Sequence, residues 1–376
     1  MNFEIRKSFS KSVKNIFCSQ FYIQLCCLAI VVISSSCSSY ILLKSESQQD
    51  IGSAFETKYS MVFVIHGDGD YLYHDTSDNN YNAAEETLTN AKKAAMENPN
   101  AEVFIFHQKP KKNFLLFFPR KDGEFYYYRN GQLIATESYW RDQEKSNFDT
   151  EVAYYNRFHV VNQIKLIKMF LYFGHEIPEF GGAGYDESYP DRTFNIDDLT
   201  IGLKGFTTDS STFDLTILST CFGGTPYTIG KLGSFSKFII ASPENLHLSY
   251  FDISALERVE VNLKDGDVHS FAKRFAQQSF DRLTRNIQTE VSVVVYDVDN
   301  VQKFLNSIKN DYNNTLNSIK GMSQANLKKI KHCDCADIPA YQISTISNGV
   351  DVLYRPARFG RSKNKQSHSG WECWKY

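Results

Sequence analysis

The segments Leu171-Tyr-Phe-Gly-His175 and Leu215-Thr-Ile-Leu-Ser-Thr-Cys221 decide the fold of this chain. Each is a short apolar run that ends in a reactive side chain, a histidine in one and a cysteine in the other. Such runs are typical of buried strands in a parallel sheet. In parallel α/β sheets, catalytic groups collect in loops that leave the carboxyl ends of the strands. A histidine and a cysteine at two such ends can meet as general base and nucleophile, which predicts a cysteine hydrolase and favours a peptidase.

The composition is that of an ordinary globular protein, with 42% hydrophobic and 22% charged residues among 376. The formal net charge is −2. Because the first 36 residues are net basic, the remainder is net acidic, and we expect no nucleic-acid partner.

The N-terminus has the layout of a secretory signal over residues 1–36, with a basic region, an apolar core at Phe21–Ile33 and then small residues. Cys37 follows three serines and resembles the lipidated cysteine of a bacterial lipoprotein. We therefore expect an exported protein of the cell envelope, held at a bacterial membrane or surface by a lipid anchor. An uncleaved anchor and plain secretion are the alternatives. Residues 37–57 are polar and predict a tether.

Strand and helix patterns alternate over residues 58–262, the predicted catalytic domain. Apart from the two opening segments, the expected strands are Met61–Ile65, Glu102–Phe106 and Phe238–Ala241, and the expected helices are Ala83–Met96, Tyr154–Lys168 and Ile196–Gly205. Between them, Phe114–Phe118 and Phe125–Tyr128 predict a hairpin, and Arg129-Asn-Gly131 the next turn. The alternation predicts an α/β fold whose mostly parallel sheet has helices on both faces.

Residues 263–376 predict an α+β extension with a cysteine-bearing tail. Val268–Thr284 and Val301–Ile308 have helical patterns, and Val291–Val295 has the pattern of a strand. Cys333, Cys335 and Cys373 allow one disulfide in an exported protein, and the spacing leaves its pairing open.

The residues after Cys221 favour a reactive thiol. In the sequence Phe222-Gly-Gly-Thr-Pro226, Thr225 suits a helix N-cap and Pro226 the first helical position. A helix beginning there would favour the thiolate through its dipole. His175 would accept the thiol proton and later protonate the leaving amine. Alternatively, His175 is a strand-end histidine bound to backbone and Cys221 is a small core residue.

The order of these segments resembles the clostripain-like peptidases, within the wider group of caspase-like cysteine peptidases. The resemblance spans residues 59–310 and is carried by Met61–Asp70, Phe213–Gly223, Phe238–Glu244 and Val291–Leu305. It implies a caspase-like fold, a protein or peptide substrate, a thioester intermediate and no obligatory cofactor.

The resemblance also implies roles for individual residues. Cys221 would be the nucleophile and His175 the general acid/base, with an oxyanion hole formed by the backbone N–H groups of Cys221 and Glu176. The family usually has Gly at position 176. Where the family usually has an Asp that binds a basic substrate side chain, this chain has Ser219, so Glu244, Asp252 or Asp68 would have to supply that charge.

Three other interpretations compete with the peptidase. Ser219–Gly223 also fits the nucleophile elbow of α/β-hydrolases, for which His247 or His269 would be the base. A second alternative is a catalytically weak or inactive caspase-like lipoprotein that acts as a binding module. The third adds a calcium ion at a cluster of acidic and histidine side chains: His66, Asp68, Asp70, His74 and Asp75.

Overall fold

The computed structural model describes residues 56–67, 72–74, 80–111, 113–114, 118–141, 148–159, 165–183, 185–207, 212–246, 250–263, 266–322, 329–339, 341 and 348–375. The predicted signal, Cys37 and nearly all of the tether lie outside these residues and stay predictions, as do the domain boundaries. Among the described residues, no helix is long and apolar enough to cross a membrane.

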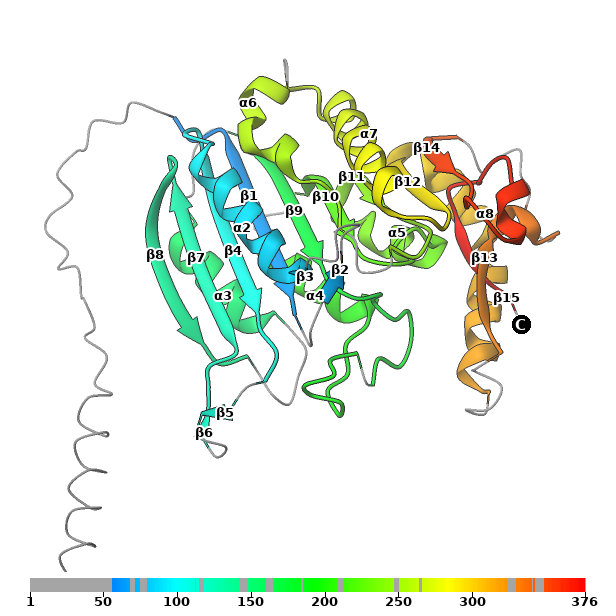
Figure 1. Ribbon diagram of the computed structural model, residues 1–376, viewed down its shortest axis with the longest axis horizontal. Helices are drawn as coiled ribbons and strands as arrows, with labels where there is room; N and C mark the ends of the chain where they lie inside the picture. The colour runs from blue at the N-terminus through cyan, green and yellow to red at the C-terminus, as the bar shows by residue number, and fades with distance from the viewer. Residues whose placement is uncertain are drawn as a thin grey trace, which may run out of the picture. The chain divides into compact units, whose positions relative to one another are not determined.

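Nine strands form one twisted sheet (Figure 1). In spatial order they are β14 (Val350–Arg355), β12 (Val291–Asp297), β11 (Ser236–Ala241), β10 (Phe213–Ser219), β9 (Ile167–Phe173), β1 (Tyr59–His66), β4 (Ala101–Gln108), β7 (Gly123–Arg129) and β8 (Gln132–Tyr139). The five central strands, from β11 to β4, are parallel, and each edge carries two antiparallel strands. The mostly parallel sheet expected from the sequence is confirmed.

Side chains of each central strand alternate between two hydrophobic cores, because successive residues of a strand point to opposite faces. In β1, Met61, Phe63 and Ile65 lie in one core, and Val62 and Val64 lie in the other. Both faces are therefore apolar and need a covering layer.

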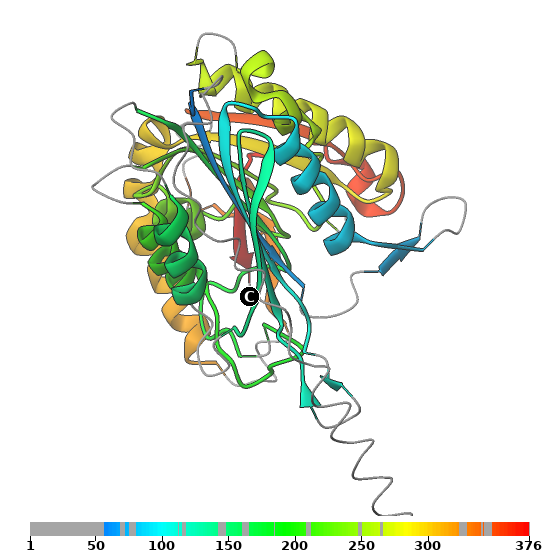
Figure 2. The ribbon, with the colours of Figure 1, turned by 90° about the vertical axis from the view of Figure 1, so that its left-hand side faces the viewer.

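Helices supply that layer on both faces (Figure 2). One core takes side chains from α2 (Ala83–Met96), α6 (Val259–Asn262) and α7 (Val268–Asn286), with the short helix η1 (Ser254–Arg258). The other takes them from α3 (Asp149–Phe158), α4 (Ile196–Phe206), α5 (Pro226–Leu232) and α8 (Val298–Lys320).

Local sequence explains where several elements begin. Asn82 accepts backbone N–H groups at the start of α2, and Asn195 and Asp198 form a capping box at the start of α4. Asn130 and Gly131 both have positive φ, as the predicted tight turn between β7 and β8 requires.

Two local predictions are wrong. The segment Phe125–Tyr128 does not pair with Phe114–Phe118, because it lies in β7, between β4 and β8. The helix expected over Tyr154–Lys168 is α3, which ends at Phe158, and β9 already begins at Ile167. In the part of the chain that the structure describes, three two-stranded ladders stand apart from the large sheet: β2 (Leu72–His74) with β3 (Asn80–Asn82), β5 (Asn113–Phe114) with β6 (Phe118–Pro119), and β13 (Lys331–Asp334) with β15 (Glu372–Lys375).

The tail folds back on the rest of the chain. β14 extends the large sheet beside β12. The strands before and after it, β13 and β15, form an antiparallel pair, called the tail ladder below, next to a disulfide between Cys335 and Cys373. The remaining tail cysteine, Cys333, is a free thiol, and burial raises its pKa to about 11. The short helices η3 (Cys335–Asp337) and η4 (Arg361–Asn364) complete the segment.

Candidate active site

His175 and Cys221 follow neighbouring parallel strands at the same level of the sheet. The last paired residues of β9 and β10 are Phe173 and Ser219, and each candidate lies two residues further along its strand's course. The N–H of Gly174 donates to the carbonyl of Ser219 at 3.4 Å, which keeps the two loops together. Both side chains are partly exposed at the carboxyl edge of the sheet, where the sequence predicts the chemistry.

The Cys221 sulfur has polar partners in the loop after β11. Its thiol donates to Oδ1 of Asn245 at 3.2 Å, and the backbone N–H of Leu246 donates to the sulfur at 3.3 Å. An N–H directed at sulfur favours the thiolate over the thiol. The predicted helix begins as expected, with the Thr225 hydroxyl accepting the Thr228 N–H and Pro226 in the first turn. Because α5 has only seven residues and its N-terminus is capped by Thr225, its dipole adds no separate support for a Cys221 thiolate.

The loop after the nucleophile is held in an unusual conformation. Phe222 has φ of 50°, a left-handed value that is rare for a bulky side chain and marks functional sites more often than ordinary loops. Its N–H donates to the carbonyl of Glu244 at 3.3 Å. At Gly224, a Cβ would clash with the Tyr296 hydroxyl, so only glycine permits this close packing.

Glu176, which follows His175, is tied to the tail. Its carboxylate Oε1 lies 3.2 Å from Nε2 of His332 in β13. The same imidazole stacks on the ring of Phe222, with ring centroids 3.7 Å apart and an interplanar angle of 1°. The residue after each candidate catalytic group therefore touches one tail histidine.

Two of the specificity candidates are engaged within the fold. Ser219 is buried, and its hydroxyl accepts the N–H of Phe251 at 3.0 Å. The Asp252 carboxylate accepts the backbone N–H of Ser254 at 2.9 Å and a side-chain N–H of Gln278 at 3.2 Å. Asp68 lies outside the described residues.

Glu244, the remaining specificity candidate, belongs to a cluster with three tail residues. Its carboxylate lies 3.2 Å from Nε2 of His368, and Glu372 and Asp334 each place a carboxylate oxygen 3.8 Å from the same nitrogen. Burial raises the pKa of Glu372 to about 7. Lys365 lies 3.2 Å from Asp334 and balances part of the negative charge.

Glu244, His368 and Glu372 bring possible ligand atoms close enough to hold a metal ion. The histidine geometry argues against that use. In neutral His368, Nδ1 accepts the N–H of Gly370 at 2.9 Å, which leaves the proton on Nε2. In the charged form both nitrogens carry protons. Neither form presents a lone pair to a metal at Nε2, and the distances of 3.2–3.8 Å are those of a cluster of charged side chains.

Glu179 joins four segments around the site. This buried carboxylate accepts hydrogen bonds from the Thr225 hydroxyl, from the Tyr312 hydroxyl at 3.0 Å and from the Trp374 indole N–H at 2.8 Å. Burial raises its pKa, and the three donors act against that rise. The loop after His175, the helix after Cys221, α8 and β15 thus meet at one side chain.

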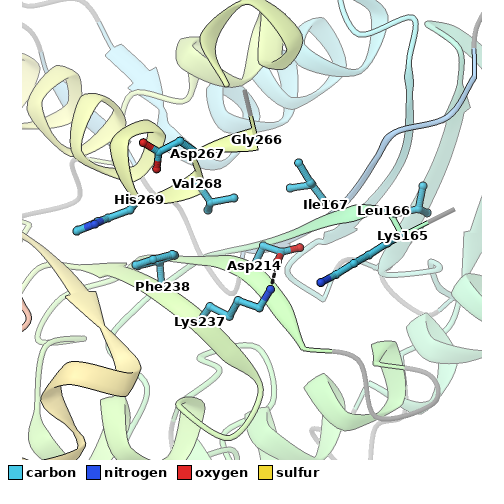
Figure 3. A pocket seen from close by; sticks show the side chains of 10 residues that line it. All are labelled: Lys165, Leu166, Ile167, Asp214, Lys237, Phe238, Gly266, Asp267, Val268 and His269. Carbon is cyan, nitrogen blue, oxygen red and sulfur yellow. Dashed lines mark hydrogen bonds and ion pairs between the residues drawn. The ribbon is translucent and has the colours of Figure 1, made fainter. Parts of the chain in front are cut away.

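The structure separates His269 from the nucleophile. His269 lines a hollow of about 400 Å³ at the amino ends of β9, β10 and β11, where Lys237 pairs with Asp214 at 2.6 Å (Figure 3). Because Asp214 lies at the amino end of β10 and Cys221 follows its carboxyl end, this hollow lies at the opposite edge of the sheet. His269 cannot serve as the base of an α/β-hydrolase, and His247 lies outside the described residues.

The calcium hypothesis falls mostly on residues outside the described part of the chain, including Asp68, Asp70 and Asp75. His66 is buried, and its Nδ1 lies 2.9 Å from the side-chain oxygen of Gln108. The described contacts of His66 thus leave the calcium prediction untested.

Five residues at or around the site could not be named from the sequence: Glu179, Asn245, Leu246, His332 and His368. Asn245 and Leu246 follow the strand that the resemblance associated with specificity, and that position was a usable signal. The two histidines lie more than a hundred residues beyond Cys221, and no local pattern connects them with it.

Comparison with known proteins supports the fold. No family model and no curated protein matches the chain. Among solved structures, it is similar to an inactive zymogen C11 protease from Parabacteroides distasonis, with 10% identity over 85% of this chain and 92% of that one and a TM-score of 0.56. It is also similar to the secreted C11 cysteine protease iotapain from Bacteroides thetaiotaomicron, with 10% identity over 84% and 93% and a TM-score of 0.56.

A third structure is a secreted C11 cysteine protease from Bacteroides thetaiotaomicron in complex with an irreversible peptide inhibitor. It is 14% identical over 64% of this chain and 66% of that one, with a TM-score of 0.44. At such low identity the two longer matches show the fold alone. The chain has the caspase-like fold of the C11, or clostripain-like, cysteine proteases, as the sequence predicts.

Proposed function

We propose that this protein is an exported cysteine endopeptidase that uses Cys221 as nucleophile and His175 as general acid/base. One observation carries the proposal: the two residues follow adjacent parallel strands at the same level, at the edge of the sheet where such folds place their chemistry. The N–H of Leu246 that points at the sulfur adds electrostatic support for a thiolate.

In this mechanism His175 takes the thiol proton, and the Cys221 sulfur attacks the peptide carbonyl carbon. The N–H groups of Cys221 and Glu176 stabilise the oxyanion that forms. The C–N bond then breaks, His175 gives its proton to the leaving amine, and a thioester remains on the enzyme. Water, deprotonated by His175, attacks the thioester and releases the new carboxyl terminus and the free thiol.

Export and anchoring rest on the N-terminal sequence. The basic region, apolar core and Cys37 support a lipoprotein signal and a place in the cell envelope. The proposed partners are therefore a protein or peptide substrate and, through the lipid, a membrane. A lipid mass on the peptide that begins at Cys37 would test this part alone.

A non-catalytic caspase-like lipoprotein is the second candidate. It is favoured by the hydrogen bond that the Cys221 thiol donates to Oδ1 of Asn245, because a bond donated by the thiol stabilises its neutral form.

A peptide-library cleavage assay separates the two candidates. We expect the wild-type protein to cut peptides, and Cys221→Ala and His175→Ala to abolish cleavage while His269→Ala retains it. If the wild-type protein and Cys221→Ala give the same cleavage profile, the proposed peptidase is wrong.

A further inference from the structure

The tail ladder, formed by β13 and β15, is hydrogen-bonded to both loops that carry the candidate catalytic residues. The N–H of Glu372 in β15 donates to the carbonyl of Gly224 at 3.0 Å, in the loop after Cys221. Trp374 donates its indole N–H to Glu179, in the loop after His175. These two hydrogen bonds therefore hold the tail ladder against the candidate site.

His332 pairs with Trp374 across the tail ladder, and its side chain contacts the loops after His175 and after Cys221. The centroid of its ring lies 3.9 Å from that of a Trp374 ring, and the ring also stacks on Phe222. Its Nε2 meets Glu176, and its side chain is only 16% exposed. Ring contacts on two neighbours and the polar contact with Glu176 leave the imidazole little freedom to turn.

The two loop residues that His332 contacts, Phe222 and Glu176, both have unusual backbone requirements. Phe222 holds a positive φ, which persists only where its surroundings enforce it. Glu176 stands where the resemblance implies glycine and is expected to direct its N–H at the oxyanion. A stacked ring restrains Phe222, and the imidazole nitrogen 3.2 Å from its carboxylate restrains Glu176, so one side chain contacts both loops of the candidate centre.

We propose that His332 is a positioning residue of the catalytic centre, supplied by the tail, which holds Phe222 and Glu176 in the conformations that the reaction needs. The inference rests on the proposed peptidase function. In this proposal the tail ladder contributes to catalysis. Loss of the His332 contacts therefore lowers turnover more than it weakens substrate binding.

Steady-state kinetics on the full chain test this role. We expect His332→Ala to lower kcat about tenfold to a hundredfold, as misplaced catalytic groups do, with KM changed less than about threefold. His332→Phe keeps a ring on Phe222 and loses the contact with the Glu176 carboxylate, and we expect it to recover part of kcat. Because the phenylalanine variant keeps the packing, it also covers the case in which the alanine variant does not fold.

His269→Ala is the matched control. His269 also stacks on a phenylalanine, Phe238, and pairs with a carboxylate, that of Asp351 at 3.1 Å, but at the opposite edge of the sheet. We expect its kcat to equal that of the wild type. Active wild-type protein with unchanged kcat in both His332 variants would overturn the positioning role alone. A raised kcat would also overturn it, because the tail would then be a cover. Wild-type protein without any turnover would remove the proposed function itself.

Discussion

Replacing Glu179 by alanine should destabilise the protein by about 3–5 kcal/mol. The change leaves three buried donors without an acceptor, those of Thr225, Tyr312 and Trp374. A buried donor left unsatisfied costs roughly 1–3 kcal/mol, and the lower part of that range applies here because the Thr225 and Tyr312 hydroxyls can turn. The cavity left by the side chain adds a further cost, and removal of a buried charge offsets part of the total.

Glu179→Gln is the matched variant and should cost less than about 1 kcal/mol. The Trp374 N–H can only donate, so the amide oxygen takes the position of the carboxylate oxygen that it meets. The amide NH₂ then faces hydroxyls, which can turn to accept it. Because burial raises the pKa of Glu179, a neutral group in its place loses little.

Urea unfolding of the three proteins, followed by tryptophan fluorescence, measures these differences. The predicted order of midpoints is wild type, then glutamine slightly lower, then alanine far lower. An alanine variant within about 1 kcal/mol of the wild type would refute the idea that Glu179 joins the four segments. A glutamine variant as unstable as alanine would show that the charge itself is needed.

Three further predictions concern the loops and the tail. Gly224→Ala should destabilise by about 1–3 kcal/mol through overpacking, because its Cβ would meet the Tyr296 hydroxyl; a smaller cost in a Tyr296→Phe background, measured by thermal melts, checks the contact. Since burial raises the pKa of Glu372 to about 7 from 4.5, the fold favours its protonated form, and stability falls as pH rises between these values. Glu372→Gln should remove that part of the pH dependence of the melting temperature, and parallel curves would contradict it. Finally, because Glu244 is paired with His368 and the Asp252 carboxylate is engaged within the fold, neither should confer a preference for cleavage after Arg or Lys; a preference in peptide libraries that Glu244→Gln abolishes would contradict this.

Much of the sheet could be predicted because its strands are apolar on both faces. Buried parallel strands show as short apolar runs, and β1, β4, β9, β10 and β11 were all found in this way. Helix starts with a clear cap were also predictable, as at Pro226. Both candidate catalytic residues follow from the same reasoning, since they end two of these runs.

The missed features depend on contacts between distant residues or on weak patterns. The helix expected over Val301–Ile308 extends to Lys320 as α8, although its second half is rich in asparagine. Buried Tyr312, Leu316 and Ile319 continue the helical spacing there, so a signal was present. The stacking of His332 on Phe222 had no such signal, because a sequence pattern does not show which surfaces meet.

The pairing of Cys221 with His175 is tested most directly by the rate of Cys221 alkylation. Iodoacetamide labelling at neutral pH, quantified by mass spectrometry on separate peptides, compares Cys221 with Cys333, whose raised pKa makes it a slow internal reference. We predict that Cys221 reacts much faster than Cys333, and that His175→Ala slows only Cys221 while His269→Ala changes neither. Equal, slow labelling of both thiols, unaffected by His175→Ala, would contradict a catalytic dyad in this protein.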